Sequence, residues 1–586
     1  MFKLSLWNTL TRKKTFDEGG HLHSELKRCL SVLDVMFIAV GHMIGAGIFV
    51  LTGSVVRNTA GPSVIISFLM AGFAALLSAF SYAEFGARFP RAGSAYTYAY
   101  VGVGELWAFI IGWTVLLEYM IGNAAVARSW SAYFDNLIGG RLSNFTVDTI
   151  GELAHSGGFF SQYLDILAFL LIVAVAIAVS LGGKASANVN TTFVLLNVTV
   201  LIIVIVCGFI YADWSLWLGT TDSGVSKFFP YGFQGTLAGA ATCFFAFIGF
   251  EALGSASEEA KNPGKTIPLA TFGSLTLVTT LYVLMAATLT LMLPYDQIHP
   301  SAAYAEAFAA KGATIPKYVI TVGALCGMIN NLVTGAFALP RSVYAMADDG
   351  LIFKWFGRIN KRTKVPLNAI IVFTLLNGLI AAVFDLEALV EFLSIGTLLA
   401  YSIVSACVII LRHQGAPLEG QEDELDDGGT LANWLPCRDF FSNLGASNTI
   451  VYGVIAMLVG DFWLALCFRF ALHTHIYGMI MCGIAGVFIL LAFTFIIAHK
   501  QNSLQLIYKV PFVPFIPALG LLINCFMMAF LNWLTWVRMV VWMVIGLVIY
   551  FGYGVRHSKE GRKIRAIKAA GGHVPKHIVP PSVVKA

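Results

Sequence analysis

The sequence predicts an all-α membrane protein that crosses the lipid bilayer many times. Of its 586 residues, 58% are hydrophobic and 12% are charged, and the mean hydropathy is +0.78. A soluble domain carries about 25% charged residues. Apolar runs of roughly 20 residues, the length that an α-helix needs to cross the hydrocarbon core, recur along the chain. Together these observations exclude a soluble globular fold.

These apolar runs predict about fourteen membrane-spanning helices. Each run is long enough for one crossing and is separated from the next by a more polar segment. An even number of crossings would leave both termini on the same side of the membrane. The predicted spans are residues 33–54, 62–84, 101–126, 163–182, 190–212, 235–256, 268–293, 316–337, 366–386, 388–411, 449–468, 475–498, 511–531 and 534–555.

A long polar insert divides the spans into two groups. Residues 412–448 are acidic and rich in glycine, a composition typical of a disordered cytoplasmic linker. The linker separates a ten-helix core, residues 33–411, from four C-terminal helices, residues 449–555. Residues 1–32 form a polar N-terminal segment, and residues 556–586 form a basic tail. We expect both of these terminal segments to be cytoplasmic.

The distribution of lysine and arginine supports this orientation. Basic residues gather before the first span, in the loop from 341 to 364 and after the last span, as expected for cytoplasmic segments. The net charge of +5 is therefore a topology signal and does not indicate a nucleic-acid partner. On the opposite side, Asn144-Phe145-Thr146 predicts N-glycosylation at Asn144. The nine cysteines lie in predicted spans or cytoplasmic segments, so we expect no disulfide framework, no metal site and no cofactor.

Glycines interrupt the first predicted span. Gly41, Gly45 and Gly47 lie at its centre, and each costs about 0.5–1 kcal/mol relative to alanine in a helix. Backbone groups that leave a helix inside the bilayer must face protein or a wet cavity. Residues 245–250 interrupt the sixth span in the same way, and paired interruptions five spans apart indicate an inverted repeat with a polar solute site between them. The alternative is close helix packing through small residues.

Few charged residues lie within the predicted spans. Glu105 and Glu118, both in the third span, point to different faces of a helix, so we do not expect them to serve one site. Glu105, near the cytoplasmic end, is expected in the headgroup region. Glu118 lies beyond mid-span and needs a cationic partner or a wet cavity, since intramembrane charge is costly. We favour a cavity position, and the alternative is a structural carboxylate between helices.

Other polar groups in the spans have weaker signals. Glu84 and Glu251 end the second and sixth spans, where a place at the membrane interface or a pair with nearby Lys and Arg is the simpler interpretation. His42 is expected to be a neutral, hydrogen-bonded imidazole, and the alternative is a proton relay. Asn330 and Asn331 are amides in the eighth span that either line the cavity or join helices.

Several segments resemble the amino acid–polyamine–organocation transporters, and in particular their fourteen-span branch, the cationic amino acid transporters. The resemblance extends from about residue 25 to 560. It therefore implies a core of five plus five helices in an inverted repeat, followed by four C-terminal helices. The segments that carry it are residues 41–53, 82–90, 93–96, 104–109, 257–268, 340–350 and 394–401.

This resemblance implies a set of binding residues. Backbone amides of the first span would hold the substrate α-carboxylate, and carbonyls of the sixth span would hold its α-amino group. Glu105 matches a glutamate needed for transport in the family, and Glu118 matches a position that faces the substrate side chain in some bacterial relatives. The implied amides are those of Met43, Ile44, Gly45, Ala46 and Gly47, and the implied carbonyls are those of Phe245, Ala246 and Ile248.

The chain also departs from the family pattern. Well-characterised animal members have a small residue at the position of Glu118, whereas a less characterised, type-4-like subgroup of doubtful transport activity has glutamate there. Proton-coupled relatives have a lysine where this chain has Asn197, which favours a facilitator or exchanger over a proton symporter. The predicted outer loops lack a cysteine, so no disulfide-linked heavy chain is expected.

The resemblance implies transport of cationic L-amino acids (arginine, lysine and ornithine) by alternating access, with no enzyme activity. The expected location is the plasma membrane. The alternatives are a carrier of neutral or other amino acids and a transport-silent sensor or scaffold that uses the same pocket.

Overall fold

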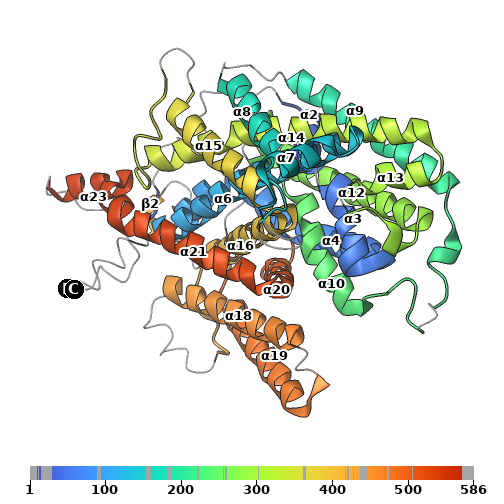
Figure 1. The fold of residues 1–586 in the computed structure, drawn as a ribbon. Coiled ribbons are helices and arrows are strands. Elements are labelled where there is room, and N and C mark those ends of the chain that lie inside the picture. The colour runs from blue at the N-terminus through green and yellow to red at the C-terminus, as the bar shows by residue number, and fades with distance from the viewer. Residues whose placement is uncertain are drawn as a thin grey trace.

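The computed structural model of the protein is almost entirely helical (Figure 1). It describes residues 10, 12–14, 30–45, 47–88, 94–153, 160–180, 187–220, 224–251, 253–254, 257, 260–300, 302–360, 365–415, 417–418, 421–425, 428–435, 446–470, 474–503 and 506–569. Apart from isolated bridges, the strands in this part of the chain are the short antiparallel pair β1 (Pro417–Leu418) and β2 (Gln421–Leu425).

Helices occupy most of the chain in the order that the apolar runs predict. The N-terminal half contains α2 (Val32–Met43), η1 (Gly47–Leu51), α3 (Thr52–Val55), η2 (Val56–Ala60), η3 (Gly61–Ser63), α4 (Val64–Arg88), α5 (Ser94–Gly102), α6 (Glu105–Leu137), α7 (Arg141–Ile150), α8 (Ile166–Ser180), α9 (Ala187–Ile210), η4 (Trp214–Leu216), α10 (Gly232–Cys243), η5 (Phe244–Phe247) and α12 (Pro263–Met292). The C-terminal half contains η7 (Tyr295–Gln297), α13 (Ala303–Ala310), α14 (Thr314–Asp348), α15 (Leu367–Val383), α16 (Leu386–Arg412), α18 (Ala446–Arg469), α19 (Ile476–Ile497), α20 (Phe515–Phe530), α21 (Trp533–Ile549), η9 (Tyr550–Gly554), α22 (Val555–His557) and α23 (Lys559–Ala569).

The helices have the lengths and compositions of membrane spans. Within the described part of the chain, nine helical stretches are long and apolar enough to cross a bilayer, and shorter apolar helices accompany them. The protein is therefore a polytopic membrane protein, as predicted. The finer prediction of about fourteen crossings in an inverted repeat stays a prediction.

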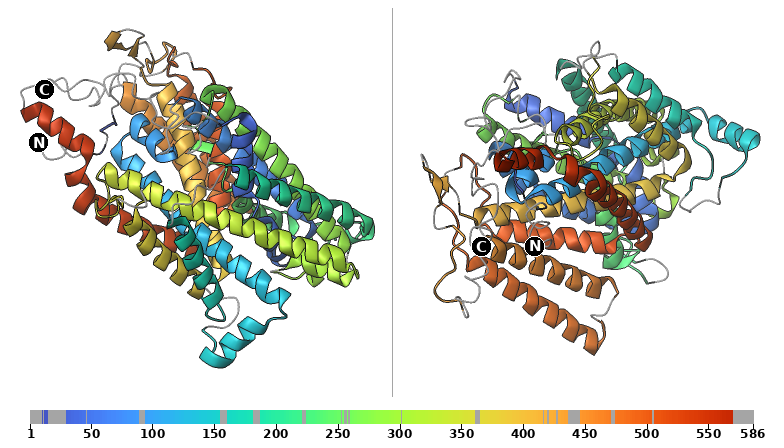
Figure 2. Two further views of the ribbon diagram at one scale, coloured as in Figure 1. Left: turned by 90° about the horizontal axis from the view of Figure 1, so that it is seen from above. Right: turned by 90° about the vertical axis from the view of Figure 1, so that its left-hand side faces the viewer.

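Two helices form the centre of the bundle. In the most hydrophobic 18-residue stretch of each helix, 78% of α6 and 89% of α16 are buried inside the protein, whereas only 17% of α19 is buried. α18 and α19 pack together at one edge, where α20 joins α18 to α16 and α4 (Figures 1 and 2). The apolar side chains that α19 exposes, including Leu490 and Leu491, have the character of a lipid-facing surface.

The first predicted span is broken at its middle. α2 begins with a capping box, in which Asp34 N–H donates to Ser31 Oγ and Ser31 N–H donates to Asp34 Oδ2 at 2.9 Å. The helix ends at Met43, and helical structure resumes with η1 at Gly47. This interruption coincides with the glycine cluster that the sequence singles out.

The sixth predicted span is broken as well. α10 ends at Cys243 and tightens into the 3₁₀ turn η5. Ile248 then adopts an extended conformation, and Gly249 has a φ of 124°, which a residue with a side chain rarely adopts. Both predicted breaks are therefore confirmed as features of the backbone.

The polar insert contains more regular structure than its composition predicts. The β1–β2 hairpin lies within residues 412–448, which we predict to be a disordered linker. Further along, Gly429 N–H donates to Lys500 O and Ala432 N–H donates to Ala498 O, both at 2.8 Å. In residues 429–432, backbone hydrogen bonds to the chain that follows α19 provide partners that the composition of the insert does not predict.

Candidate functional site

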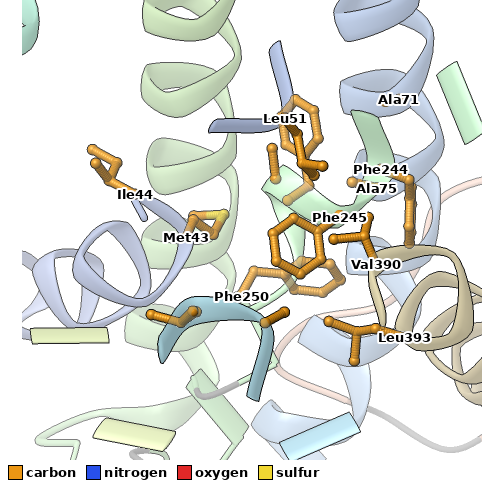
Figure 3. Close-up of a cluster of buried hydrophobic side chains, with 14 of the residues drawn as sticks. Met43, Ile44, Leu51, Ala71, Ala75, Phe244, Phe245, Phe250, Val390 and Leu393 are labelled. Carbon is orange, nitrogen blue, oxygen red and sulfur yellow. The ribbon is translucent and has the colours of Figure 1, made fainter. Parts of the chain in front are cut away.

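A cavity lies between the two helix breaks. The break in the first span contributes His42, Met43 and Gly47 to the cavity wall, and the break in the sixth span contributes Phe245 and Ile248. Figure 3 shows apolar side chains of both breaks gathered here with Leu393 of α16. The cavity volume of about 40 Å³ is room for about three water molecules.

Glycines bring the two breaks into backbone contact. A Cβ atom added to Gly47 would lie 2.5 Å from the Cα atom of Ala246. A Cβ atom added to Gly249 would lie 2.9 Å from the backbone carbon of His42. Both separations are too short for real side-chain atoms, so these positions require glycine. The alternative interpretation of the first break, close packing through small residues, is thus correct in part, because the same glycines serve both the packing and the break.

Side chains from neighbouring helices satisfy the carbonyls that the first break releases. Asn331 Nδ2 donates to His42 O at 2.6 Å, and Tyr282 Oη donates to Met43 O at 2.7 Å. The first N–H groups of a helix, by contrast, have no acceptor within their own helix, and that end carries the positive pole of its dipole. The start of η1 at the cavity wall is therefore suited to an anionic group such as a carboxylate.

The wall of the cavity also carries two carboxylates. Glu118 of α6 is 3% exposed, and neither of its carboxylate oxygens has a partner at standard hydrogen-bond geometry in the described part of the chain, although the side chains of Thr397 and Glu251 lie beside it. Glu251 is 5% exposed, and its Oε2 accepts hydrogen bonds from Tyr401 Oη at 2.6 Å and from Gly249 N–H at 2.9 Å. No lysine or arginine of the described residues lines the cavity beside these two carboxyl groups.

The position of Glu251 corrects a prediction. We predict an interfacial or ion-paired role for Glu84 and Glu251 alike. Glu84 does form an ion pair with Arg412, 3.3 Å from Oε1 to Nε. Glu251 instead lies in the cavity wall, because the break in the sixth span ends just before it and Gly249 N–H donates a hydrogen bond to its carboxylate.

Comparison with known proteins gives the family. The amino acid permease model matches residues 30–419, and the model of the C-terminus of amino acid permeases matches residues 508–558. Cationic amino acid transporter 4 of Mus musculus is 40% identical, with 94% of this chain and 91% of that protein covered. The chain belongs to the cationic amino acid transporter family.

Other members of the family are similar over comparable lengths. Cationic amino acid transporter 4 of Homo sapiens is 38% identical, with 95% of this chain and 92% of that protein covered. Cationic amino acid transporter 3, mitochondrial, of Arabidopsis thaliana is 33% identical, with 94% and 95% covered. The members of this family are transporters and not enzymes.

In this family member, Glu105 is not part of the cavity wall, and its side chain is enclosed by protein, whereas we expect it to face the headgroup region. Its side chain is fully buried, and Arg12 contacts both of its carboxylate oxygens at 2.5 Å. The hydroxyls of Tyr100 and Ser558 donate to Oε2, and that of Tyr550 donates to Oε1. Burial opposes the charge of Arg12, but the hydrogen bonds and charge of Glu105 outweigh it and raise the pKa of the guanidinium.

Glu105 therefore joins both ends of the chain to the core of the transporter. Lys14 and Tyr96 make a second contact of this kind, since both bind the carboxylate of Asp349, with Lys14 Nζ at 2.7 Å from Oδ2. Sequence reasoning misses the partner of Glu105, because Arg12 is 93 residues away in the chain.

The asparagine side chains that the sequence singles out lie in two environments, inside and outside the cavity wall. Asn331 lines the cavity, whereas Asn330 lies half-buried on a neighbouring face of α14. Gly335, one turn after Asn331, also lines the cavity, and this helical spacing is the signal that distinguishes the two residues. Asn197 of α9 is 1% exposed and packs against Gly327 of α14 outside the cavity wall.

The remaining predicted residues have simple locations. Ile44 is buried, and Gly45 packs so closely on Asn331 that an added Cβ atom would lie 2.9 Å from its Nδ2. Ala246 lies against Gly47, and Ala46 lies outside the described residues. Asn144 is exposed on the short helix α7.

Proposed function

We propose that the protein carries cationic L-amino acids, namely arginine, lysine and ornithine, across the membrane by alternating access. Transport would be facilitated diffusion or exchange. One observation carries this proposal: Glu118 and Glu251 line a cavity between two broken helices, with no lysine or arginine of the described chain beside them. A negatively charged cavity of this kind favours a substrate with a positive side chain.

The substrate would bind through its backbone and its side chain separately. Its α-carboxylate would face the N–H groups at the start of η1, and its α-ammonium would face the carbonyls of the sixth break. The side-chain cation would then lie against Glu118. The proposed backbone ligands are Met43, Ile44, Gly45, Ala46 and Gly47 for the carboxylate and Phe245, Ala246 and Ile248 for the ammonium.

The size of the cavity supports a cycle with closed and open states. Room for about three water molecules is too little for an arginine, so the broken helices must move apart from the surrounding bundle to admit it. In this cycle the Arg12–Glu105 pair would hold closed the side of the membrane on which the termini lie. Asn197 and Asn330 would support the packing of α9 and α14 during the movement.

We place this cycle in a fourteen-span protein with five-plus-five inverted repeats, located in the plasma membrane with both termini cytoplasmic. Asn144, which is exposed, would then be glycosylated on the outer side. No disulfide-linked heavy chain would be required.

The direct test is uptake of a radiolabelled substrate panel by cells that express the protein with verified surface delivery. We expect uptake of arginine above mock-transfected cells, and we expect Glu118→Gln to reduce arginine uptake at least tenfold while citrulline, the neutral isostere, loses less. Uptake of neutral amino acids alone would identify a neutral carrier. Arginine binding without uptake would identify a sensor.

A further inference from the structure

The two carboxylates in the cavity wall have unequal surroundings. Glu251 is held by two donors, Tyr401 Oη and Gly249 N–H, which both stabilise its negative charge. Neither carboxylate oxygen of Glu118 has a partner at standard hydrogen-bond geometry among the described residues. The polar side chains beside it are Glu251 itself and Thr397, whose hydroxyl already donates to Leu393 O at 3.2 Å. Both side chains are almost fully buried, and the charge of each acts on the other. In a closed cavity of low polarity, two neighbouring carboxylates do not both ionise without a cation.

The groups around the pair do not provide that cation. Among the described residues, the titratable side chains that face the two carboxylates are His42 of α2, Tyr82 of α4, Tyr119 of α6 and Tyr401 of α16. The three tyrosines are neutral acids. Nδ1 of His42 lies 3.3 Å from Gly249 O, so the imidazole is directed at a backbone carbonyl. The positive charge that balances the second carboxylate must therefore arrive with a proton or with a substrate.

We propose that Glu118 carries a proton when the site is empty, and that the side-chain cation of a substrate displaces this proton. The inference rests on the proposed function and adds the proton as the second transported ion. Glu118 is the protonated member because Glu251 already receives the hydrogen bonds that favour the ionised form. Asn197, which cannot titrate, has no part in this exchange.

The exchange conserves charge at each step. The O–H bond of Glu118 breaks when the substrate cation arrives, and the proton passes to water on the side from which the substrate enters. After the substrate leaves on the other side, a proton from that side restores the O–H bond. The carboxylate pair and its occupant carry the same net charge in the empty and loaded states. One cation therefore moves in one direction and one proton moves in the other.

The test measures protons and substrate together on the full-length protein. Purified protein is titrated with arginine in weak buffer that contains a pH-sensitive dye, with citrulline as the neutral comparison. We expect one proton released for each arginine bound and none for citrulline. The apparent Kd for arginine should rise about tenfold for each pH unit of acidification, because binding is linked to the loss of one proton. In proteoliposomes, an acidic interior should accelerate arginine uptake, and an inside-negative potential should not.

Two variants separate the site from the rest of the molecule. Infrared spectroscopy of the empty protein should detect the carbonyl band of a protonated carboxylic acid, which arginine removes and which Glu118→Gln lacks. Glu306→Gln is the matched control, because Glu306 is a partly exposed partner of Lys317 and does not line the cavity. It should retain both the band and the proton release. If Glu118→Gln does not fold, the wild-type protein alone provides the test, because arginine should remove its infrared carbonyl band.

Each outcome decides the proposal. Arginine binding without proton release, or uptake that increases with an inside-negative potential, would overturn the exchange and leave the proposed function intact. If arginine neither binds nor enters, the proposed function fails. The infrared band of the empty protein then decides by itself whether Glu118 holds the proton.

Discussion

The buried ion pair between Arg12 and Glu105 gives a stability prediction whose size follows from its surroundings. The Glu105 side chain is fully buried, and that of Arg12 is 6% exposed. Removing one partner of a buried pair costs about 3–5 kcal/mol, because it leaves the other charge uncompensated. Arg12→Met should fall near the lower limit, about 3 kcal/mol, since the hydroxyls of Tyr100, Tyr550 and Ser558 still donate to Glu105.

A double-mutant cycle in mixed detergent micelles measures this energy from the free energy of unfolding. Arg12→Met combined with Glu105→Gln should cost about 2 kcal/mol less than the sum of the single changes, because no buried charge remains. The matched control is Lys559→Met, which breaks an exposed pair with Asp348 and should cost less than about 1 kcal/mol. The reasoning would be refuted if the double mutant lost as much free energy of unfolding as the two single mutants together. It would also be refuted if Arg12→Met were no less stable than Lys559→Met.

Two further changes test the helix break and a buried histidine. Gly47→Ala should destabilise the protein by about 1–3 kcal/mol and abolish uptake, since the new Cβ atom would meet Ala246. The control is Gly483→Ala, which has open space around it and should be neutral or slightly stabilising. Thermal unfolding in detergent micelles measures both variants. Burial lowers the pKa of His413 to about 4, so the native protein holds this imidazole neutral and loses stability as pH falls from about 6.5 towards 4. His413→Gln should reduce the stability difference between about pH 7.5 and pH 5 by about 2 kcal/mol, and an unchanged difference would contradict this assignment.

The sequence predicts features that follow from local chemistry in an apolar setting. Gly45 and Gly47 identify the first break, because closely spaced glycines are costly in a membrane helix. Glu118 is a cavity candidate, because an intramembrane carboxylate needs a wet or charged neighbour, and the structure does place it in the cavity wall. Both inferences require only the chain and the properties of the bilayer.

The sequence does not predict features that depend on distant parts of the chain. The burial of Glu105 depends on Arg12 and Ser558, which lie far from it in the sequence and adjacent to it in the fold. Glu251 enters the cavity because of the backbone turn at Gly249 and the position of Tyr401 on another helix. No local pattern contains these contacts, so the second carboxylate of the site emerges only from the structure.

The most direct test of the proposed function is arginine accumulation by proteoliposomes that contain this protein alone. We expect uptake above that of protein-free vesicles, inhibited by lysine and ornithine and reduced at least tenfold by Glu118→Gln. Uptake equal to that of protein-free vesicles, with the protein folded and inserted, would contradict it.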